Sequence, residues 1–451
     1  MRRVLILLAM AAFSFGAAAE VAKGKLIENV VSRADATQTY TLYLPTSYDA
    51  AKKAPLLLIF DPRGRGTSAA EIFREAAEEL GWILISSNQT RSDVADDPNE
   101  RAVNALLPET AVYASDPRRL YATGFSGTAI LACLVGIGTG RLAGVIAVGG
   151  RLVQTAPPAS FSFAHYGFAG ESDFNNLEMR MIDWMLEREG KHPHRFQSFP
   201  GEHRWITPEL ARDALGWMEV LAKNEAVTPA VFARDVAATD ALRGLEALRR
   251  YRAILRTYDG RVPLDKVRAR VATLEADPAV RAELEDERRW DDFERQYLKD
   301  MLTKIPSIFA SYRAKRGVTS PATIERALRL SELRRRASRS GAEGATARRL
   351  LEAIYTQLAF YLPPPLFKDG EYSLAAALLG TAVTIHPDRW VAWYNLAAAH
   401  AREGSPQRAY LALEKAIAAG FADAASLESD HDFASLRTEK RFRELVEGLR
   451  R

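Results

Sequence analysis

The stretch that most constrains this chain is residues 120–132, which read LYATGFSGTAILA. An apolar run with aromatic and β-branched residues, typical of a strand, leads into Ser126, and an Ala- and Leu-rich run, typical of a helix, follows at once. Ser126 lies between Gly124 and Gly127. A strand that enters a helix through one serine needs a sharp turn with small neighbours, and such a turn exposes the hydroxyl above the strand ends. We interpret the stretch as a nucleophile elbow with Ser126 as the nucleophile.

A second interpretation is a glycine-rich junction between a strand and a helix with no catalytic role. Thr128 stands where the G-x-S-x-G pattern has glycine. The stretch alone does not separate the two interpretations, so the choice depends on the rest of the chain.

Composition and charge exclude several classes of protein. The 451 residues are too many for one hydrophobic core and indicate two or three domains of ordinary globular composition, 47% hydrophobic and 26% charged. The net charge of +4 is small and arginines are interleaved with acidic residues, so we expect no nucleic-acid partner. Cys133 is the single cysteine and no Cys/His spacing fits a metal site. We therefore expect no intramolecular disulfide, no metal and no cofactor.

The first residues resemble an export signal. Arg2 and Arg3 precede an apolar run over residues 4–15, and Ala17-Ala18-Ala19 follows. This pattern predicts a signal peptide over residues 1–19, cleaved after Ala19, and a secreted or periplasmic protein. The apolar run is shorter than the roughly 20 residues of a membrane span, although an uncleaved N-terminal anchor is the alternative.

Residues 20–224 alternate between strand and helix patterns. Strands are expected at 25–30, 38–44, 55–60, 82–86, before Ser126, and at 142–148, 161–169 and 194–199. A first helix is expected from a cap at Thr67 or Ser68 to about residue 80, and a second helix ends near residue 114. The helix after Ser126 is expected to stop at the glycines Gly136, Gly138 and Gly140. Two more are expected at 177–188 and from a cap at Thr207 to about 221. Helices between successive strands predict a mostly parallel sheet covered by helices on both faces, in one α/β domain.

The remaining sequence predicts helices alone. They are expected at about 237–257, 263–289, 290–314, 321–338 and 344–361, in a helical domain over residues 225–362. The prolines 363–365 predict a rigid break.

An internal repeat of 34 residues follows within residues 363–451. Small and large apolar residues recur at that spacing: Ala409, Leu413, Ala416 and Phe421 follow Ala375, Leu379, Ala382 and Pro387. The period and the alternation resemble the tetratricopeptide repeat, in which paired helices stack. One full repeat and half of another fit, which implies a short helical cap and a surface for a protein partner.

Partners for Ser126 are expected in loops at the carboxyl ends of later strands. A serine hydroxyl needs a base within hydrogen-bond reach and an acid that orients the base. Asp173 follows the strand at 161–169, and His203 follows the strand at 194–199, in the order acid before histidine. Asp173 could instead cap a helix, His203 could be a surface histidine, and Glu171 could replace Asp173 as the acid. The coincidence of all three positions favours a triad of Ser126, Asp173 and His203.

The tetrahedral intermediate needs N–H donors for its oxyanion. We expect the N–H of Gly127 to be one donor. The second is expected in the loop after the strand at 55–60, where Pro62 has no N–H, so Arg63 is the first choice and Gly64 the second. Arg204 and Trp205 follow the base directly and are candidates for substrate contact or for packing of the last helix.

Together these segments resemble the secreted α/β-hydrolases of the feruloyl esterase and polyhydroxybutyrate depolymerase group. The segments that carry the resemblance are residues 55–60, 116–127, 170–173 and 201–203. It covers roughly residues 38–222, with Asp61-Pro62 in place of the family's usual His-Gly. The resemblance implies an α/β-hydrolase fold and a serine carboxylic-ester hydrolase that forms an acyl-enzyme.

Two other functions stay open at this point. A serine peptidase has the same fold and triad, and a helical interaction protein could carry a secondary or decayed hydrolase domain. Only residues 151–162 separate two of the expected strands, too few for a lid domain. We therefore expect an open cleft that takes small-molecule or polymer-borne acyl groups.

Overall fold

A computed structural model of the protein describes residues 22–94, 98–150, 161–189, 193–314 and 319–451. The predicted signal peptide and most of the short connection at 151–162 lie outside these residues. The chain divides into two compact units. Of the described residues, the first unit comprises 22–94, 98–147, 161–165 and 206–227, and the second comprises 148–150, 166–189, 193–205, 228–314 and 319–451.

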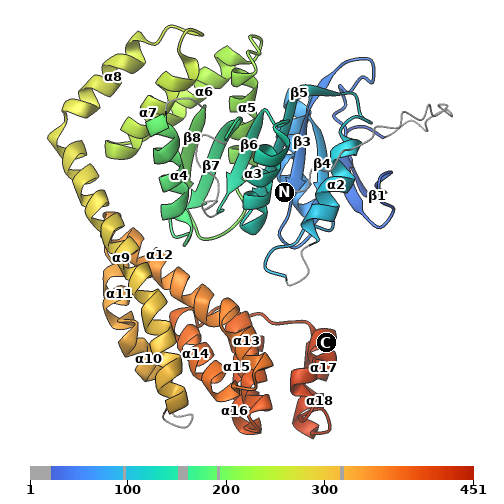
Figure 1. The fold of residues 1–451 in the computed structure, drawn as a ribbon, viewed down its shortest axis with the longest axis vertical. Helices are drawn as coiled ribbons and strands as arrows, with labels where there is room; N and C mark the ends of the chain where they lie inside the picture. The colour runs from blue at the N-terminus through green and yellow to red at the C-terminus, as the bar shows by residue number, and fades with distance from the viewer. Residues whose placement is uncertain (1–21, 95–97, 151–160, 190–192, 315–318) are drawn as a thin grey trace, which may run out of the picture. The chain divides into compact units, whose positions relative to one another are not determined.

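Eight strands form one mostly parallel sheet (Figure 1). They are β1 (Leu26–Val31), β2 (Thr39–Tyr43), β3 (Ala54–Phe60), β4 (Ile83–Ser87), β5 (Ser115–Phe125), β6 (Gly144–Val148), β7 (Ala164–Gly170) and β8 (His194–Phe199). Their order in the sheet is β1-β2-β4-β3-β5-β6-β7-β8. β2 is antiparallel to β1 and β4, whereas β3 is parallel to β4 and β5. This topology is that of the α/β-hydrolase fold and confirms the predicted fold class.

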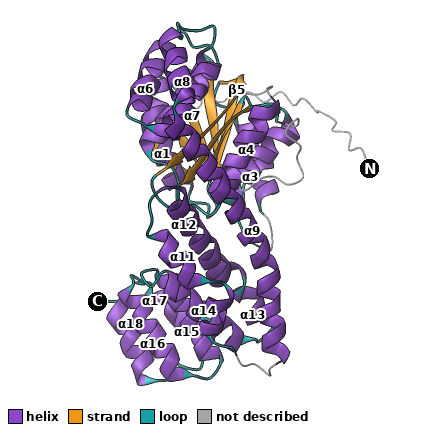
Figure 2. Ribbon diagram, turned by 90° about the vertical axis from the view of Figure 1, so that its left-hand side faces the viewer, coloured by secondary structure: helices purple, strands orange, loops and turns teal. Residues whose placement is uncertain are grey.

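The first unit shows why these strands form. β3 is apolar along its length, and Leu56 to Phe60 are fully buried, as expected for a strand covered on both faces. The helices of this unit are α1 (Gly66–Leu80), α2 (Asn99–Glu109), α3 (Gly127–Thr139) and α5 (Pro208–Leu221). Figure 2 shows α1 and α3 on opposite sides of the strands.

Three helix boundaries in the first unit differ from the sequence prediction. α1 begins at Gly66, so Thr67 and Ser68 lie inside the helix and cap nothing. α2 ends at Glu109, before the predicted 114. α3 continues through Gly136 and Gly138 and ends only at Gly140, whose φ of 61° closes the helix. Gly136 is needed inside the helix because a Cβ there would lie 2.5 Å from the ring of Phe163.

The second unit contains β8, most of β7 and the remaining helices. These are α4 (Asn176–Glu189), α6 (Thr228–Asp240), α7 (Gly244–Tyr258), α8 (Asp265–Ala276), α9 (Pro278–Ala314), α10 (Pro321–Ala327), α11 (Leu330–Ala337), α12 (Gly341–Thr356), α13 (Pro363–Lys368), α14 (Tyr372–Ile385), α15 (Trp390–Arg402), α16 (Pro406–Ala418), α17 (Ala424–Ser429) and α18 (Lys440–Leu449). One hydrophobic core extends from Tyr297 in α9 to Val446 in α18. No strand occurs in the described residues beyond 228, as the sequence predicted.

Several helix boundaries in this unit correct the prediction. The segment expected as one helix at 237–257 is divided between α6 and α7, where Gly244 has a φ of 57°. The segment at 321–338 is likewise two helices, separated at Arg329 with a φ of 52°. In contrast, α9 continues through Trp290, where one helix was expected to end and another to begin. The apolar periodicity of the sequence predicts which residues are helical, but it does not show where a single residue with a left-handed backbone separates two helices.

The prolines at 363–365 start a helix and are no plain break. They occupy the first turn of α13. Proline is tolerated there because the N–H groups of a first turn have no acceptor within the helix, so no hydrogen bond is lost. In the repeat region, Phe421 packs against the rings of Trp390 and Tyr394, at centroid distances of 5.2 and 4.7 Å. None of the helices in the described residues is both long and apolar enough to cross a bilayer.

Candidate active site

The backbone at Ser126 has the geometry of a nucleophile elbow. Ser126 joins β5 to α3 with φ 57° and ψ −129°, a conformation that a residue with a side chain rarely adopts. The turn requires small neighbours. A Cβ on Gly124 would lie 2.1 Å from the carbonyl oxygen of Thr128, and a Cβ on Gly127 would lie 2.5 Å from Ser92 Oγ. The structure therefore gives a physical reason for both glycines beside Ser126.

Thr128 stabilises this turn in place of the expected glycine. Its fully buried Oγ1 lies 2.6 Å from the carbonyl oxygen of Phe60 and 2.8 Å from that of Phe125. The same oxygen accepts the N–H of Phe125 at 3.1 Å. The hydroxyl thus ties the end of β3 to the residue before Ser126.

The two amides expected as oxyanion donors in the loop after β3 both have an acceptor within that loop. Arg63 N donates to Asp61 Oδ1 at 2.9 Å, and Gly64 N donates to the Asp61 carbonyl oxygen at 3.1 Å. Asp61 Oδ1 also accepts the N–H of Arg65 at 3.1 Å, and the Asp61 side chain is buried. Both expected amides are therefore already engaged. Gly127 N, in contrast, begins α3, where N–H groups have no acceptor within the helix.

Ser92 is a residue beside the elbow that the sequence did not single out. Its Oγ is buried and has no hydrogen-bond partner in the described part of the chain. Ser92 N donates to the carbonyl oxygen of Pro62 at 2.9 Å, which holds the loop after β4 against the loop after β3. The hydroxyl consequently lies directly against Gly127. No sequence signal marks it, because Ser92 is one of many polar residues in that loop.

In the second unit, Asp173 and His203 form an acid–histidine pair, with the acid buried and the imidazole partly exposed. His203 Nδ1 lies 3.0 and 2.9 Å from the two carboxylate oxygens of Asp173, whose side chain is fully buried. Asn175 N donates to Asp173 Oδ1 at 2.8 Å, and the ring of Phe174 packs on the imidazole at 4.5 Å. A neutral imidazole that donates its Nδ1–H to this carboxylate carries no proton on Nε2, and in that tautomer Nε2 can act as a general base.

The turns that carry this pair are joined by backbone hydrogen bonds. Glu171 N donates to the carbonyl oxygen of Phe199, and Ser172 N to that of Gly201, both at 2.9 Å. A Cβ on Gly170 would lie 2.4 Å from the carbonyl oxygen of Glu202. Acid and base are therefore held at a fixed spacing before any ligand binds.

The other residues near the pair have different surroundings. The Glu171 side chain is exposed, so the acid on His203 is Asp173. Arg204 bends back over its own turn, where Nη2 donates to the carbonyl oxygen of Pro200 at 2.8 Å and the guanidinium lies 5.5 Å from the Phe199 ring. This favours packing over substrate contact for Arg204. Trp205 is partly buried.

The predicted catalytic residues are thus distributed over the two units. Ser126 and Gly127 belong to the first unit, and Asp173 and His203 to the second. In the sheet order, Ser126 follows β5, Asp173 follows β7 and His203 follows β8.

One group of metal-binding side-chain types occurs in the described residues, far along the chain from these positions. Ligand atoms of Asp430, His431 and Asp432 lie within 4.8 Å of one another. Asp430 already accepts the hydroxyl of Tyr394 at 2.7 Å, and Asp432 pairs with Arg402 at 3.3 Å. The carboxylates are therefore engaged by protein groups.

Solved structures of the same fold resemble this chain over less than half its length. The fluorophosphonate-binding serine hydrolase FphF of Staphylococcus aureus is 14% identical, with 44% of this chain and 99% of that chain covered and a TM-score of 0.36. A ferulic acid esterase is 16% identical, with 42% and 95% covered and a TM-score of 0.34. The acylaminoacyl peptidase of Pyrococcus horikoshii is 10% identical, with 44% and 41% covered and a TM-score of 0.32. No family model and no curated protein matches the sequence. Such similarities assign no activity to this chain.

Proposed function

We propose that the protein is a serine hydrolase that cleaves carboxylic esters with Ser126 as nucleophile, His203 as base and Asp173 as the acid that orients the base. The observation that carries the proposal is the positive φ of Ser126 between a strand and a helix. Strained backbone conformations of this kind cluster at active sites, and in a nucleophile elbow the strained turn exposes the serine hydroxyl.

Two further observations support the triad. The Asp173–His203 contact at 2.9 Å supports a neutral His203 that donates Nδ1–H to the carboxylate and accepts a proton at Nε2. The three residues follow β5, β7 and β8 in the chain order nucleophile, acid, histidine, which is the order of α/β-hydrolases.

In the proposed reaction, His203 Nε2 takes the proton of Ser126 Oγ as the oxygen attacks the ester carbonyl carbon. The tetrahedral intermediate collapses when the C–O bond to the alcohol breaks and His203 returns the proton to the departing alkoxide. Water, deprotonated by His203, then attacks the acyl-enzyme, and the carboxylic acid leaves as Ser126 regains its proton. We assign the oxyanion donors as Gly127 N–H and the Ser92 hydroxyl, because the amides of Arg63 and Gly64 bind Asp61.

Three parts of the proposal rest on the sequence. The resemblance to the feruloyl esterase and polyhydroxybutyrate depolymerase group favours esters over amides. The pattern of residues 1–19 supports export to the periplasm or beyond. The 34-residue repeat supports a protein partner for the C-terminal helices.

The test is turnover of a substrate panel by purified protein. Nitrophenyl esters of graded acyl length, feruloyl esters and dipeptides are offered to the wild type, to Ser126→Ala and to Ser68→Ala, whose exposed serine in α1 is the control. We expect ester turnover that falls by about 10³-fold or more in Ser126→Ala alone. Turnover of dipeptides alone would identify a peptidase. Absence of any turnover in the wild type would contradict the proposal.

A further inference from the structure

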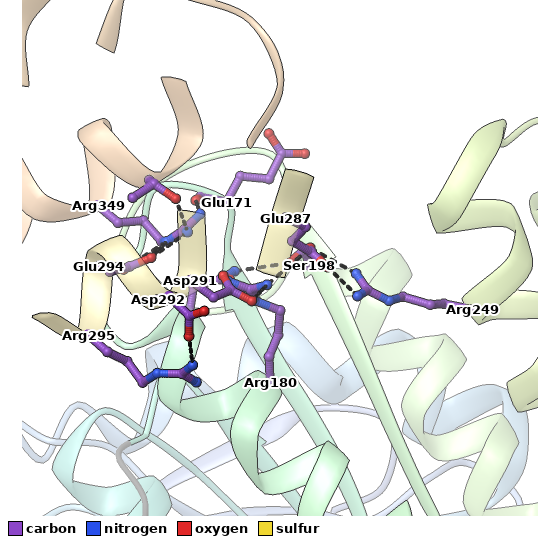
Figure 3. A network of polar contacts seen from close by, with 12 residues as sticks. Glu171, Arg180, Ser198, Arg249, Glu287, Asp291, Asp292, Glu294, Arg295 and Arg349 are labelled. Atoms are coloured by element: carbon purple, nitrogen blue, oxygen red, sulfur yellow. Dashed lines mark hydrogen bonds and ion pairs between the residues drawn. The ribbon is translucent and has the colours of Figure 1, made fainter. Parts of the chain in front are cut away.

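Arg349 is a buried arginine of the helical region, residues 228–451, and it contacts the turn that carries Asp173. It lies in α12, and its Nε is 3.0 Å from both carboxylate oxygens of Glu294 in α9, while Nη2 donates to Thr346 Oγ1 at 2.9 Å. The remaining nitrogen, Nη1, is 3.5 Å from the carbonyl oxygen of Glu171, two residues before Asp173 (Figure 3). The guanidinium thus joins α9 and α12 to the turn after β7.

Arg389 makes the corresponding contact with the turn that carries His203. It directly precedes α15, and its Nη1 and Nη2 donate to the two carboxylate oxygens of Glu352 in α12, at 2.9 and 2.8 Å. Nη2 also pairs with Glu202 Oε2 at 2.5 Å, and Glu202 is the residue before His203. The Tyr355 ring lies 4.9 Å from the guanidinium.

Glu352 holds Arg389 in this position. Burial alone would raise the pKa of the Glu352 carboxyl, but hydrogen bonds from His386 and Arg389 lower it below its usual value. Glu352 therefore stays ionised and keeps the guanidinium of Arg389 aimed at Glu202.

We propose that the helical region positions the Asp173–His203 pair through Arg349 and Arg389, and is thereby a working part of the active site. The inference rests on the proposed function for its catalytic meaning. The two turns already share the backbone hydrogen bonds of Glu171 and Ser172. The arginines fix the outer side of each turn, so that the imidazole stays on the carboxylate throughout the proton transfers.

A purely stabilising role explains the Arg389–Glu202 pair poorly. The Glu202 side chain is 56% exposed, and ion pairs with a solvated partner contribute little to folding stability. Because Glu202 is the residue before His203, the ion pair with Arg389 restrains the turn that carries the proposed base. Glu202 and Arg389 are accordingly positioning residues.

The test compares Glu202→Gln, Arg389→Gln and the double variant with Arg313→Gln in the full chain. Arg313 pairs with Glu371 in the same helical region, and both are far in sequence from the two turns, so its variant is the control. We expect each of the first two variants to lower kcat by about tenfold with KM unchanged, and the double variant to lower it no further. Arg389→Lys should regain part of the loss. The control should keep full kcat.

Two readouts do not depend on catalysis. The low-field proton resonance of the His203 Nδ1–H should broaden or move in Glu202→Gln and Arg389→Gln. The amides of Glu171 and Ser172 should exchange faster with deuterium. Unchanged kcat, resonance and exchange in these variants, or an equal loss in the control, would overturn the inference. If the wild type hydrolyses no ester while the resonance and the exchange still respond, the proposed function fails and the positioning role stands.

Discussion

Ser126 holds a backbone conformation that costs about 1–3 kcal/mol, and its neighbours show how the fold maintains it. Gly124 and Gly127 leave no room for a side chain, and Thr128 spans from Phe60 to Phe125 with one hydroxyl. The position that departs from the G-x-S-x-G pattern is therefore a stabilising contact of the elbow. A threonine there is compatible with the sharp turn because its side chain lies on the buried side.

At the same scale, Ser92→Ala tests the assigned oxyanion donor. Removing the hydroxyl should lower kcat on an ester by about 100-fold with KM nearly unchanged, because the donor acts chiefly on the transition state. Ser86→Ala is the matched control, since its Oγ in β4 is also buried without a partner in the described residues. Steady-state kinetics on one nitrophenyl ester measures both. An equal kcat for the two variants would show that the Ser92 hydroxyl is not an oxyanion donor.

Some of the candidate site residues could be predicted from the sequence and others could not. The positions of Asp173 and His203 after the ends of two strands could be predicted because those strands have clear apolar runs, whereas their roles as acid and base stay a prediction. The acceptors of the Arg63 and Gly64 amides could not be predicted, because they depend on the direction of the Asp61 carboxylate and on the turn that brings the Asp61 carbonyl oxygen to Gly64 N. Ser92 could not be singled out because it is one of many polar residues in its loop.

Among the elements, α4 and α9 are joined by buried charges. Arg180 of α4 donates to the two carboxylate oxygens of Asp291 in α9 at 3.1 and 2.7 Å, and its Nη1 also pairs with Glu287 at 3.0 Å (Figure 3). The Arg180 and Asp291 side chains are 7% and 2% exposed. The partners lie 111 positions apart, so the sequence showed only acids and arginines interleaved along helices, the usual pattern of a solvated face.

Arg180→Ala should therefore be strongly destabilising. It leaves Asp291 buried without its cation, which costs about 3–5 kcal/mol, whereas replacing both partners by Met and Leu should restore most of the stability. Arg295→Ala is the control, since Arg295 forms an exposed pair with Asp292 and should cost less than about 1 kcal/mol. Urea unfolding followed by circular dichroism measures the free energies of unfolding. A loss in Arg180→Ala no larger than in Arg295→Ala would contradict the role of this pair.

For the molecule as a whole, each of the two compact units combines segments that lie far apart in sequence. β8 and α4 belong to the same compact unit as residues 228–451, and the division of the chain into domains 20–224, 225–362 and 363–451 stays a prediction. Contacts such as Arg180–Asp291 and Arg389–Glu202 explain the grouping. The fold class was predictable because the alternation of strands and helices is local, whereas the grouping arises from pairs far apart in sequence.

Covalent labelling tests most directly whether Ser126 is an activated nucleophile. The full-length protein is treated with a fluorophosphonate probe, digested and examined by mass spectrometry, beside Ser126→Ala and Asp173→Asn. We expect one adduct, on the peptide that contains Ser126, which is absent from Ser126→Ala and forms at least about 10³-fold more slowly in Asp173→Asn. An unlabelled wild type, or an adduct on another serine that persists in Ser126→Ala, would contradict this expectation.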